Sequence, residues 1–212
     1  MPVLPKPGHL DPRAVKGWMN DEELATLARW SSQSTGVVEI GCAWGRSTLA
    51  LLQAAAPGST VYCIDHWLGS PSEIGAFGPN TGFDTARATF MANIVESGLY
   101  PNAQVIEGDS QDPATVSRVP QVDMVFIDGS HSYEYVARDL ELWAPKARYI
   151  LCGHDWTWPG VVRAVNEYTA QARYGSTGDL VWYKAIQMGG GTLWYTTRRP
   201  KLLISPDLGA SY

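Results

Sequence analysis

Apolar and polar residues along the chain switch repeatedly between two periods. Short apolar runs rich in β-branched residues predict strands at 36–40, 60–65, 103–107, 124–128 and 149–153. Stretches with helical spacing lie between them, at about 45–56, 83–97, 111–118 and 133–143, and another helix is predicted at 21–30. Strict alternation of strand and helix predicts an α/β protein whose parallel sheet is covered by helices on both faces.

The C-terminal part of the pattern breaks this alternation. A helix predicted at 160–172 is followed by an apolar run at 180–186, a glycine-rich turn at 188–191 and a second run at 192–197. Two such runs joined by a short turn predict an antiparallel hairpin rather than another crossover. The sheet is therefore expected to end in an antiparallel strand.

Proline and glycine divide the remaining chain into segments. Residues 1–20 predict an irregular N-terminal arm, 21–198 a single domain and 199–212 a C-terminal tail. Residues 66–82 form a long, glycine-rich insertion that follows the second strand. Long loops in compact domains are commonly functional, so this insertion is expected to be a lid over the ligand site.

The turn after the first strand carries the first sign of function. Glu39 and Gly41 end a buried strand, and Ala43, Gly45 and Ser47 lead directly into a helix. Small residues let a ligand approach the backbone, and the helix N-terminus offers unpaired N–H groups, so this turn predicts a nucleotide cradle. It departs from the dinucleotide fingerprint, because Ala43 replaces the second glycine and Gly45 comes one position early.

Polar residues also follow the second and third strands. Asp65, His66 and Trp67 end the second, where an acid can bridge the two hydroxyls of a ribose, and Asp109 and Ser110 end the third. Ligands of open parallel sheets bind at the carboxyl ends of the strands, so these residues are expected to join the cradle.

Strands four and five end on a second group of polar residues. Asp128 and His131 follow the fourth strand, and His154 and Asp155 follow the fifth. If the two strands are neighbours, both acids emerge at the same edge of the sheet with an imidazole in reach. Asp128, His154 and Asp155 could then hold a divalent metal. Without a metal, His131 or His154 could act as a general base.

With the glycine turn after its first strand and the hairpin predicted at 180–197, the chain resembles the class I S-adenosylmethionine-dependent methyltransferases over residues 21–198. That resemblance implies a Rossmann-like, doubly wound sheet of seven strands in the order 3-2-1-4-5-7-6, with strand 7 antiparallel. It implies S-adenosylmethionine as cofactor, with the amino acid part held by the strand-end acid and the glycine turn. It also places Asp109 near the adenine amino group and includes Asp128 among the cofactor contacts.

The ends of strands four and five narrow the resemblance to small-molecule O-methyltransferases of the catechol O-methyltransferase type, and more closely to the macrocin-type and cephalosporin hydroxylase-like branch. These relatives carry an acid after strand four and an acid pair, or an acid and an amide, after strand five. Here His154 takes one of those positions. We therefore expect a divalent metal such as Mg, Mn or Fe at this site. The histidine at position 154 departs from the oxygen ligands of these relatives, so a reaction without a metal stays an alternative.

Composition limits the partners. The net charge of −5 disfavours nucleic acid, and the chain contains no run long enough to span a membrane. Three cysteines in or beside apolar runs predict buried thiols and a cytoplasmic location. A homodimer formed through the arm is one option. Trp67, Trp156 and Trp158 predict an aromatic wall for a small-molecule acceptor such as a sugar or a phenol.

Two other functions stay open at this stage. One is an S-adenosylmethionine-binding accessory protein without turnover, which the polar ends of strands four and five disfavour. The other is a nicotinamide-dependent oxidoreductase, which Ala43 and Gly45 disfavour. Asp139 and Glu141 lie in a predicted amphipathic helix and are expected on its solvated face.

Overall fold

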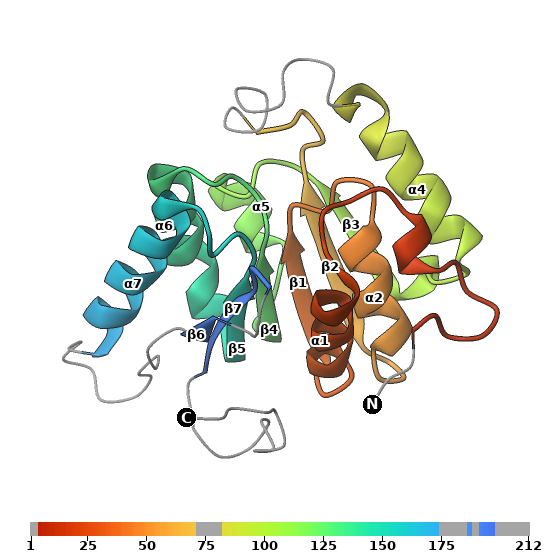
Figure 1. The fold of residues 1–212 in the computed structure, drawn as a ribbon, viewed down its shortest axis with the longest axis horizontal. Coiled ribbons are helices and arrows are strands. Elements are labelled where there is room, and N and C mark those ends of the chain that lie inside the picture. The colour runs from red at the N-terminus through yellow and green to blue at the C-terminus, as the bar shows by residue number, and fades with distance from the viewer. Residues whose placement is uncertain (1–3, 71–81, 174–185, 188–190, 198–212) are drawn as a thin grey trace.

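The strands form one mixed sheet in the computed structural model, which describes residues 4–70, 82–173, 186–187 and 191–197 (Figure 1). The order is β3-β2-β1-β4-β5-β7-β6. The pairs from β3 to β5 are parallel, and β7 pairs antiparallel with β5. The strands are β1 (Gly36–Ile40), β2 (Thr60–Asp65), β3 (Ala103–Glu107), β4 (Val122–Ile127), β5 (Ala147–Gly153), β6 (Ile186–Gln187) and β7 (Trp194–Thr197).

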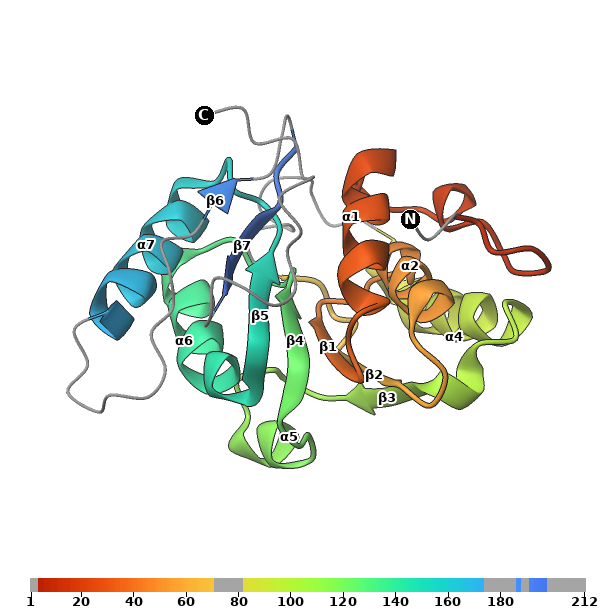
Figure 2. The same cartoon turned by 90° about the horizontal axis from the view of Figure 1, so that it is seen from below.

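Helices cover both faces of the sheet, as the alternating pattern predicts (Figures 1 and 2). On one face lie α1 (Asp21–Ser31), α2 (Arg46–Ala54) and α4 (Ala86–Glu96), and on the other α6 (Tyr133–Trp143) and α7 (Pro159–Arg173), with the short α5 (Pro113–Ser117) beside α6. Single-turn 3₁₀ helices lie at Pro12–Ala14, Phe83–Thr85, Tyr100–Asn102 and Ala144–Lys146.

Two apolar clusters, one on each face, hold these layers together. The first packs Leu27 and Leu49 from α1 and α2 against the sheet, and the second packs Leu140 and Val165 from α6 and α7 against the opposite face. β1 and β4 are buried along their full length, which is why their sequences read as continuous apolar runs rather than alternating ones.

The Rossmann-like α/β fold and the predicted antiparallel end of the sheet are confirmed. The predicted strand at 180–186 lies outside the described residues except at its last position, and β6 contributes two residues that pair antiparallel with β7. Most of the predicted lid (71–81) and the tail (199–212) also lie outside the described residues. In the ranges that the structure describes, no helix has both the length and the apolar character needed to cross a membrane.

Candidate active site

The turn between β1 and α2 has the strained backbone that its small residues predict. Gly41, Ala43 and Gly45 all have positive φ angles, of 85°, 46° and 94°. The N–H of Gly41 donates to the carbonyl of Ile64 on β2, and the N–H of Asp128 donates to Ile40 at 2.8 Å. The turn is therefore fixed to the ends of both neighbouring strands.

Asp65 braces this turn from the end of β2. One of its carboxylate oxygens, Oδ2, accepts from the N–H groups of Cys42 and Ala43 at 2.8 and 2.9 Å, and the other accepts from the N–H of Trp67. The indole of Trp67 in turn donates to the carbonyl of Ala43 at 2.8 Å and packs on Phe90. Asp65 thus holds the turn in shape while its side chain still borders the cavity described below.

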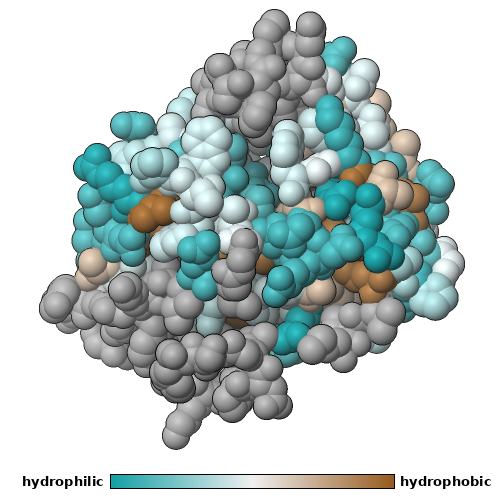
Figure 3. All heavy atoms as spheres, viewed as in Figure 1, coloured by the Kyte–Doolittle hydropathy of each residue, from teal (hydrophilic) through white to brown (hydrophobic). Residues whose placement is uncertain are grey.

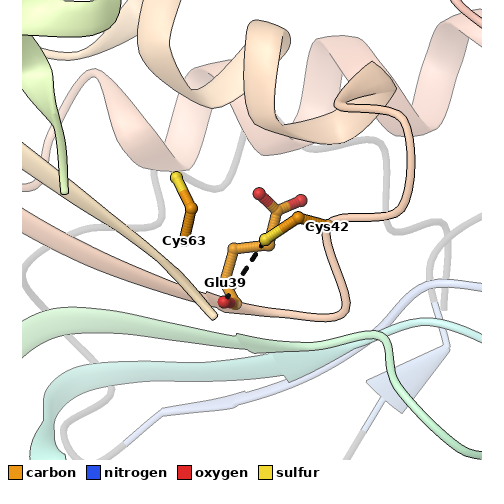
Figure 4. A group of neighbouring side chains, drawn as sticks. All are labelled: Glu39, Cys42 and Cys63. Atoms are coloured by element: carbon orange, nitrogen blue, oxygen red, sulfur yellow. Dashed lines mark hydrogen bonds between the residues drawn. The ribbon is translucent and has the colours of Figure 1, made fainter. Parts of the chain in front are cut away.

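Glu39 lies beneath the turn rather than at its surface. Figure 4 shows its carboxylate under α2, beside Cys42 and Cys63, and its side chain is fully buried. The hydroxyls of Ser47 and Thr48, in the first turn of α2, both donate to this carboxylate at 2.5 Å. Burial raises the pKa of Glu39 to about 7, against the effect of those two hydrogen bonds.

A buried acid on α6 bonds to the loop after β3, although it was predicted to lie on a solvated helix face. Asp139 on α6 is 2% exposed, not solvated, and accepts a hydrogen bond from the Ser110 hydroxyl at 2.8 Å. Burial raises the pKa of Asp139 to about 7. The Asp109 carboxylate accepts from the N–H of Gln111, which shapes the loop after β3. Asp109, Ser110 and Asp139 all border the cavity.

The acids and histidines after β4 and β5 meet as predicted. The Nδ1 atom of His154 lies 3.6 Å from Asp128 Oδ1 and 3.3 Å from Asp155 Oδ1. The second oxygen of Asp155 lies 2.9 Å from His131 Nε2, and the His131 ring stacks on Trp158 with centroids 4.7 Å apart. One oxygen each from Asp128 and Asp155 and one nitrogen of His154 lie within 4.8 Å of one another.

This cluster also includes Glu23, a residue that the sequence analysis did not single out. Its Oε1 atom lies 3.4 Å from His154 Nε2. Burial disfavours a charged His154, but the carboxylates of Asp128, Asp155 and Glu23 outweigh it and raise the pKa of His154 to about 11. Burial likewise opposes charge on Asp155, yet its bonds to His131 and His154 hold its pKa well below the ordinary range. The cluster is therefore a buried set of compensating charges.

The N-terminal arm closes one side of the site. The Arg46 guanidinium, at the start of α2, donates to the carbonyls of Met19 and Val15 at 2.8 and 2.9 Å. This clamp lays residues 16–19 along the turn, where the Trp18 and Trp44 rings lie 5.5 Å apart and the Lys16 ammonium lies 3.9 Å from the Trp44 ring centre. The sequence predicted an irregular arm at residues 1–20, but it did not predict that this arm lies over the glycine turn.

One cavity of about 430 Å³ extends across the site, from the arm and the glycine turn to the Asp128, His154 and Asp155 cluster. On the face in Figure 3, polar and pale residues predominate and strongly hydrophobic ones form small, scattered areas. All predicted site residues border the cavity except three, Glu39, Gly45 and Trp67. Trp158 also borders it, whereas Trp156 packs on Trp194 instead.

Fold and site together define a Rossmann-like α/β protein with a ligand cavity across the carboxyl ends of its parallel strands. A family model described as "Methyltransferase domain" matches residues 38–156, more than half of the chain. The chain therefore belongs to this methyltransferase family, which sets aside the nicotinamide-dependent alternative.

Solved structures share the fold at low sequence identity. Cofactor-bound Rv0187 from MTB is 18% identical with a TM-score of 0.62, over 87% of this chain and 83% of that one. An O-methyltransferase from Bacillus cereus in complex with SAH is 14% identical with a TM-score of 0.61, over 85% and 82%. The O-methyltransferase TomG from Streptomyces achromogenes, in complex with SAM, is 16% identical with a TM-score of 0.59, over 86% and 82%.

Proposed function

We propose that this protein is an S-adenosylmethionine-dependent methyltransferase that transfers a methyl group to a hydroxyl of a small molecule. The observation that carries the proposal is the single cavity that joins the glycine turn to the Asp128, His154 and Asp155 cluster. Methyl transfer needs a donor and an acceptor side by side and in line, and one continuous cavity provides this. Membership in the methyltransferase family, and the SAM and SAH named for similar structures, support it.

On the cofactor side, the proposal assigns the amino acid part to the turn at Gly41 and Ala43, the ribose to Asp65 and His66, and the adenine to Asp109 and Ser110. All six border the cavity. Glu39, Gly45 and Trp67 support the turn from outside the cavity and are not proposed to touch the cofactor. Ser47 borders the cavity and its hydroxyl also donates to Glu39, so it connects the residues that line the cavity with those that support the turn from outside.

On the acceptor side, the proposal assigns Asp128, His131, His154 and Asp155 to activation of the hydroxyl. An imidazole beside a carboxylate is an effective general base, and His131 has Asp155 at 2.9 Å. Trp158 borders the cavity and stacks on His131 within this cluster, which favours a ring-shaped or planar acceptor. A cavity of about 430 Å³ that must also hold the cofactor leaves room only for a small acceptor.

A divalent metal fits the same cluster. Asp128 and Asp155 each offer an oxygen and His154 offers one ring nitrogen, all within 4.8 Å of one another. This suits three protein ligands, provided that the metal displaces the proton that the carboxylates favour on that nitrogen of His154. A nitrogen ligand favours Mn or Fe over Mg. Such an ion would lower the pKa of the acceptor hydroxyl.

Two measurements test the function. Isothermal titration calorimetry with S-adenosylhomocysteine is expected to show 1:1 binding. Turnover is then measured as S-adenosylhomocysteine release with a panel of catechols, other phenols and sugars. Binding together with turnover supports the proposal, whereas binding without turnover on any acceptor would favour the accessory protein. No binding would overturn both.

The metal is tested separately by Mn²⁺ binding, followed by electron paramagnetic resonance. We expect one site in the wild type, its loss in Asp155→Ala, and its retention in Glu141→Gln, a control carboxylate that is well exposed and pairs with Arg138. Equal Mn²⁺ binding by Asp155→Ala and Glu141→Gln would contradict a metal at this cluster. Turnover that survives removal of divalent ions would assign activation to the histidines alone.

Four sequence-based expectations stay part of the proposal. The insertion at 66–82 is proposed as a lid, because Leu68, Gly69 and Ser70 border the cavity where the insertion begins. A homodimer through the arm and a cytoplasmic location, the latter favoured by the three buried free thiols, are proposed as well. The acidic net charge of −5 disfavours nucleic acid as the acceptor.

A further inference from the structure

The side of His154 that faces away from the cavity is held by two residues to which the proposed function gives no role. His154 Nε2 lies 2.7 Å from the Thr192 hydroxyl and 3.4 Å from Glu23 Oε1. Neither Glu23 nor Thr192 borders the cavity, although His154 does. An effect of either residue on groups in the cavity must therefore pass through the imidazole.

The hydrogen bonds have a definite direction. The Thr192 hydroxyl donates its one proton to Glu23 Oε1 at 3.2 Å, so toward His154 it can only accept. His154 Nε2 must then carry a proton and donate it to Thr192. Because Nε2 is engaged in this hydrogen bond to Thr192, Nδ1 is the nitrogen that faces Asp128 and Asp155 at the edge of the cavity.

Glu23 is itself fixed by two separate parts of the fold. Its Oε2 atom accepts from the N–H of Asn20, and the Asn20 side chain accepts from the N–H of Glu23, which together form a capping box at the start of α1. Its Oε1 atom accepts from the N–H of Thr192 at 2.6 Å, in the segment before β7. Glu23 is 5% exposed, so water competes little for these bonds.

We propose that Glu23 is a positioning residue for the methyltransferase reaction: acting through Thr192, it keeps the proton on Nε2 of His154 and directs Nδ1 toward Asp128 and Asp155. This inference rests on the proposed function. Histidines in active sites and metal sites are commonly oriented by a carboxylate bonded to the second ring nitrogen, and loss of that partner costs about 10- to 100-fold in activity.

Four variants separate positioning from simple stability. Thr192→Val removes the hydroxyl with little change in shape, and Glu23→Ala removes the carboxylate from both His154 and the capping box. Asn20→Ala is the matched control, because it removes the other half of the same capping box without touching His154. Glu23→Gln keeps an acceptor oxygen and is expected to recover part of the activity lost in Glu23→Ala.

The first readout needs no acceptor. The chain has four histidines, so ring-labelled ¹⁵N-histidine protein gives few nuclear magnetic resonance signals, and His154→Gln identifies those of His154. We expect a slowly exchanging Nε2–H signal in the wild type and in Asn20→Ala. In Thr192→Val and Glu23→Ala this signal is expected to exchange rapidly. A His154 ring that carries its proton on Nδ1 alone, or an Nε2–H signal unchanged in Thr192→Val, would overturn the inference.

The second readout uses an acceptor found in the panel. We expect kcat to fall about 10- to 100-fold in Thr192→Val and Glu23→Ala, with KM for S-adenosylmethionine within about twofold of wild type. Asn20→Ala should keep its kcat although its helix cap is weakened. If wild type shows no turnover, the proposed function fails and the resonance experiment alone decides the proton position. If wild type turns over and Thr192→Val matches it, the positioning role fails while the proposed function stands.

Discussion

Gly41 offers the sharpest test of how the glycine turn is built. A Cβ atom at this position would lie 2.1 Å from the carbonyl oxygen of Asp128 and 2.6 Å from its carbonyl carbon, and the φ angle is +85°. Both obstacles are backbone atoms, which cannot rotate away as a side chain would. Gly41→Ala must therefore either force the ends of β1 and β4 apart or move the turn out of the cavity wall.

The expected cost comes from three sources. A positive φ costs a non-glycine residue about 1–2 kcal/mol, and forcing an extra methyl into a packed position costs about 1–3 kcal/mol. Loss of the hydrogen bond from Asp128 N to Ile40 O, which is 2.8 Å long, adds about 1 kcal/mol. The total of roughly 3–6 kcal/mol is a large share of the 5–15 kcal/mol by which a typical domain is stable.

Gly58→Ala is the matched control for this experiment. Gly58 has a φ of +82°, almost that of Gly41, but a Cβ there would meet nothing within 4 Å. Urea unfolding of both variants, followed by tryptophan fluorescence, should show about 1–2 kcal/mol lost in Gly58→Ala and at least about 2 kcal/mol more in Gly41→Ala. Equal losses in the two variants would refute the argument that the end of β4 blocks this position.

Three further predictions concern charge and the arm. Since burial raises the pKa of Glu39 from 4.5 to about 7, the folded state binds its proton more tightly than the unfolded state. The raised pKa contributes stability on the order of 3 kcal/mol at most, which is present below about pH 4.5 and is lost as the pH rises through 7. Urea unfolding at pH 4.5 and at pH 8 should show this loss of stability in wild type and a smaller loss in Glu39→Gln. Arg46→Met should release the arm, so that trypsin cleaves after Arg13 and Lys16 faster than in wild type, and an unchanged rate on gels would contradict the clamp. Asp155→Asn should lower turnover by about 100-fold, while calorimetry shows S-adenosylhomocysteine affinity within about threefold of wild type; parallel losses of both would place Asp155 on the cofactor side instead.

Much of the fold could be predicted because its signals are local. The first three strands match their predicted bounds, and the helix at 133–143 matches as well. β4 and β5 begin two residues earlier than predicted, at Val122 and Ala147, since strand ends depend on pairing as well as on composition. The meeting of Asp128 with His154 and Asp155 followed from one topological rule, that neighbouring parallel strands end at the same edge.

The missed residues divide into two kinds. The burial of Asp139 had a local signal: Asp139 comes three residues after Val136 and four before Trp143, on the buried face of α6 that also includes Leu140. Its charge suggested a solvated face, but position on the helix decided its burial. Glu23, in contrast, lies 131 positions before His154 along the chain, and no spacing rule relates residues so distant.

The geometry of the acid and histidine cluster depends on how closely the strand ends approach. At Gly153 a Cβ would lie 2.5 Å from the carbonyl oxygen of Ile127, so a larger residue would hold the end of β5 away from β4. With glycine there, the His154 N–H reaches that same carbonyl at 3.1 Å and the imidazole comes within 3.6 Å of Asp128. Gly41 does the same between β1 and β4. The distances between the proposed donor and acceptor sites are thus set by backbone contacts at two glycines, while the charged side chains would supply the proposed chemistry.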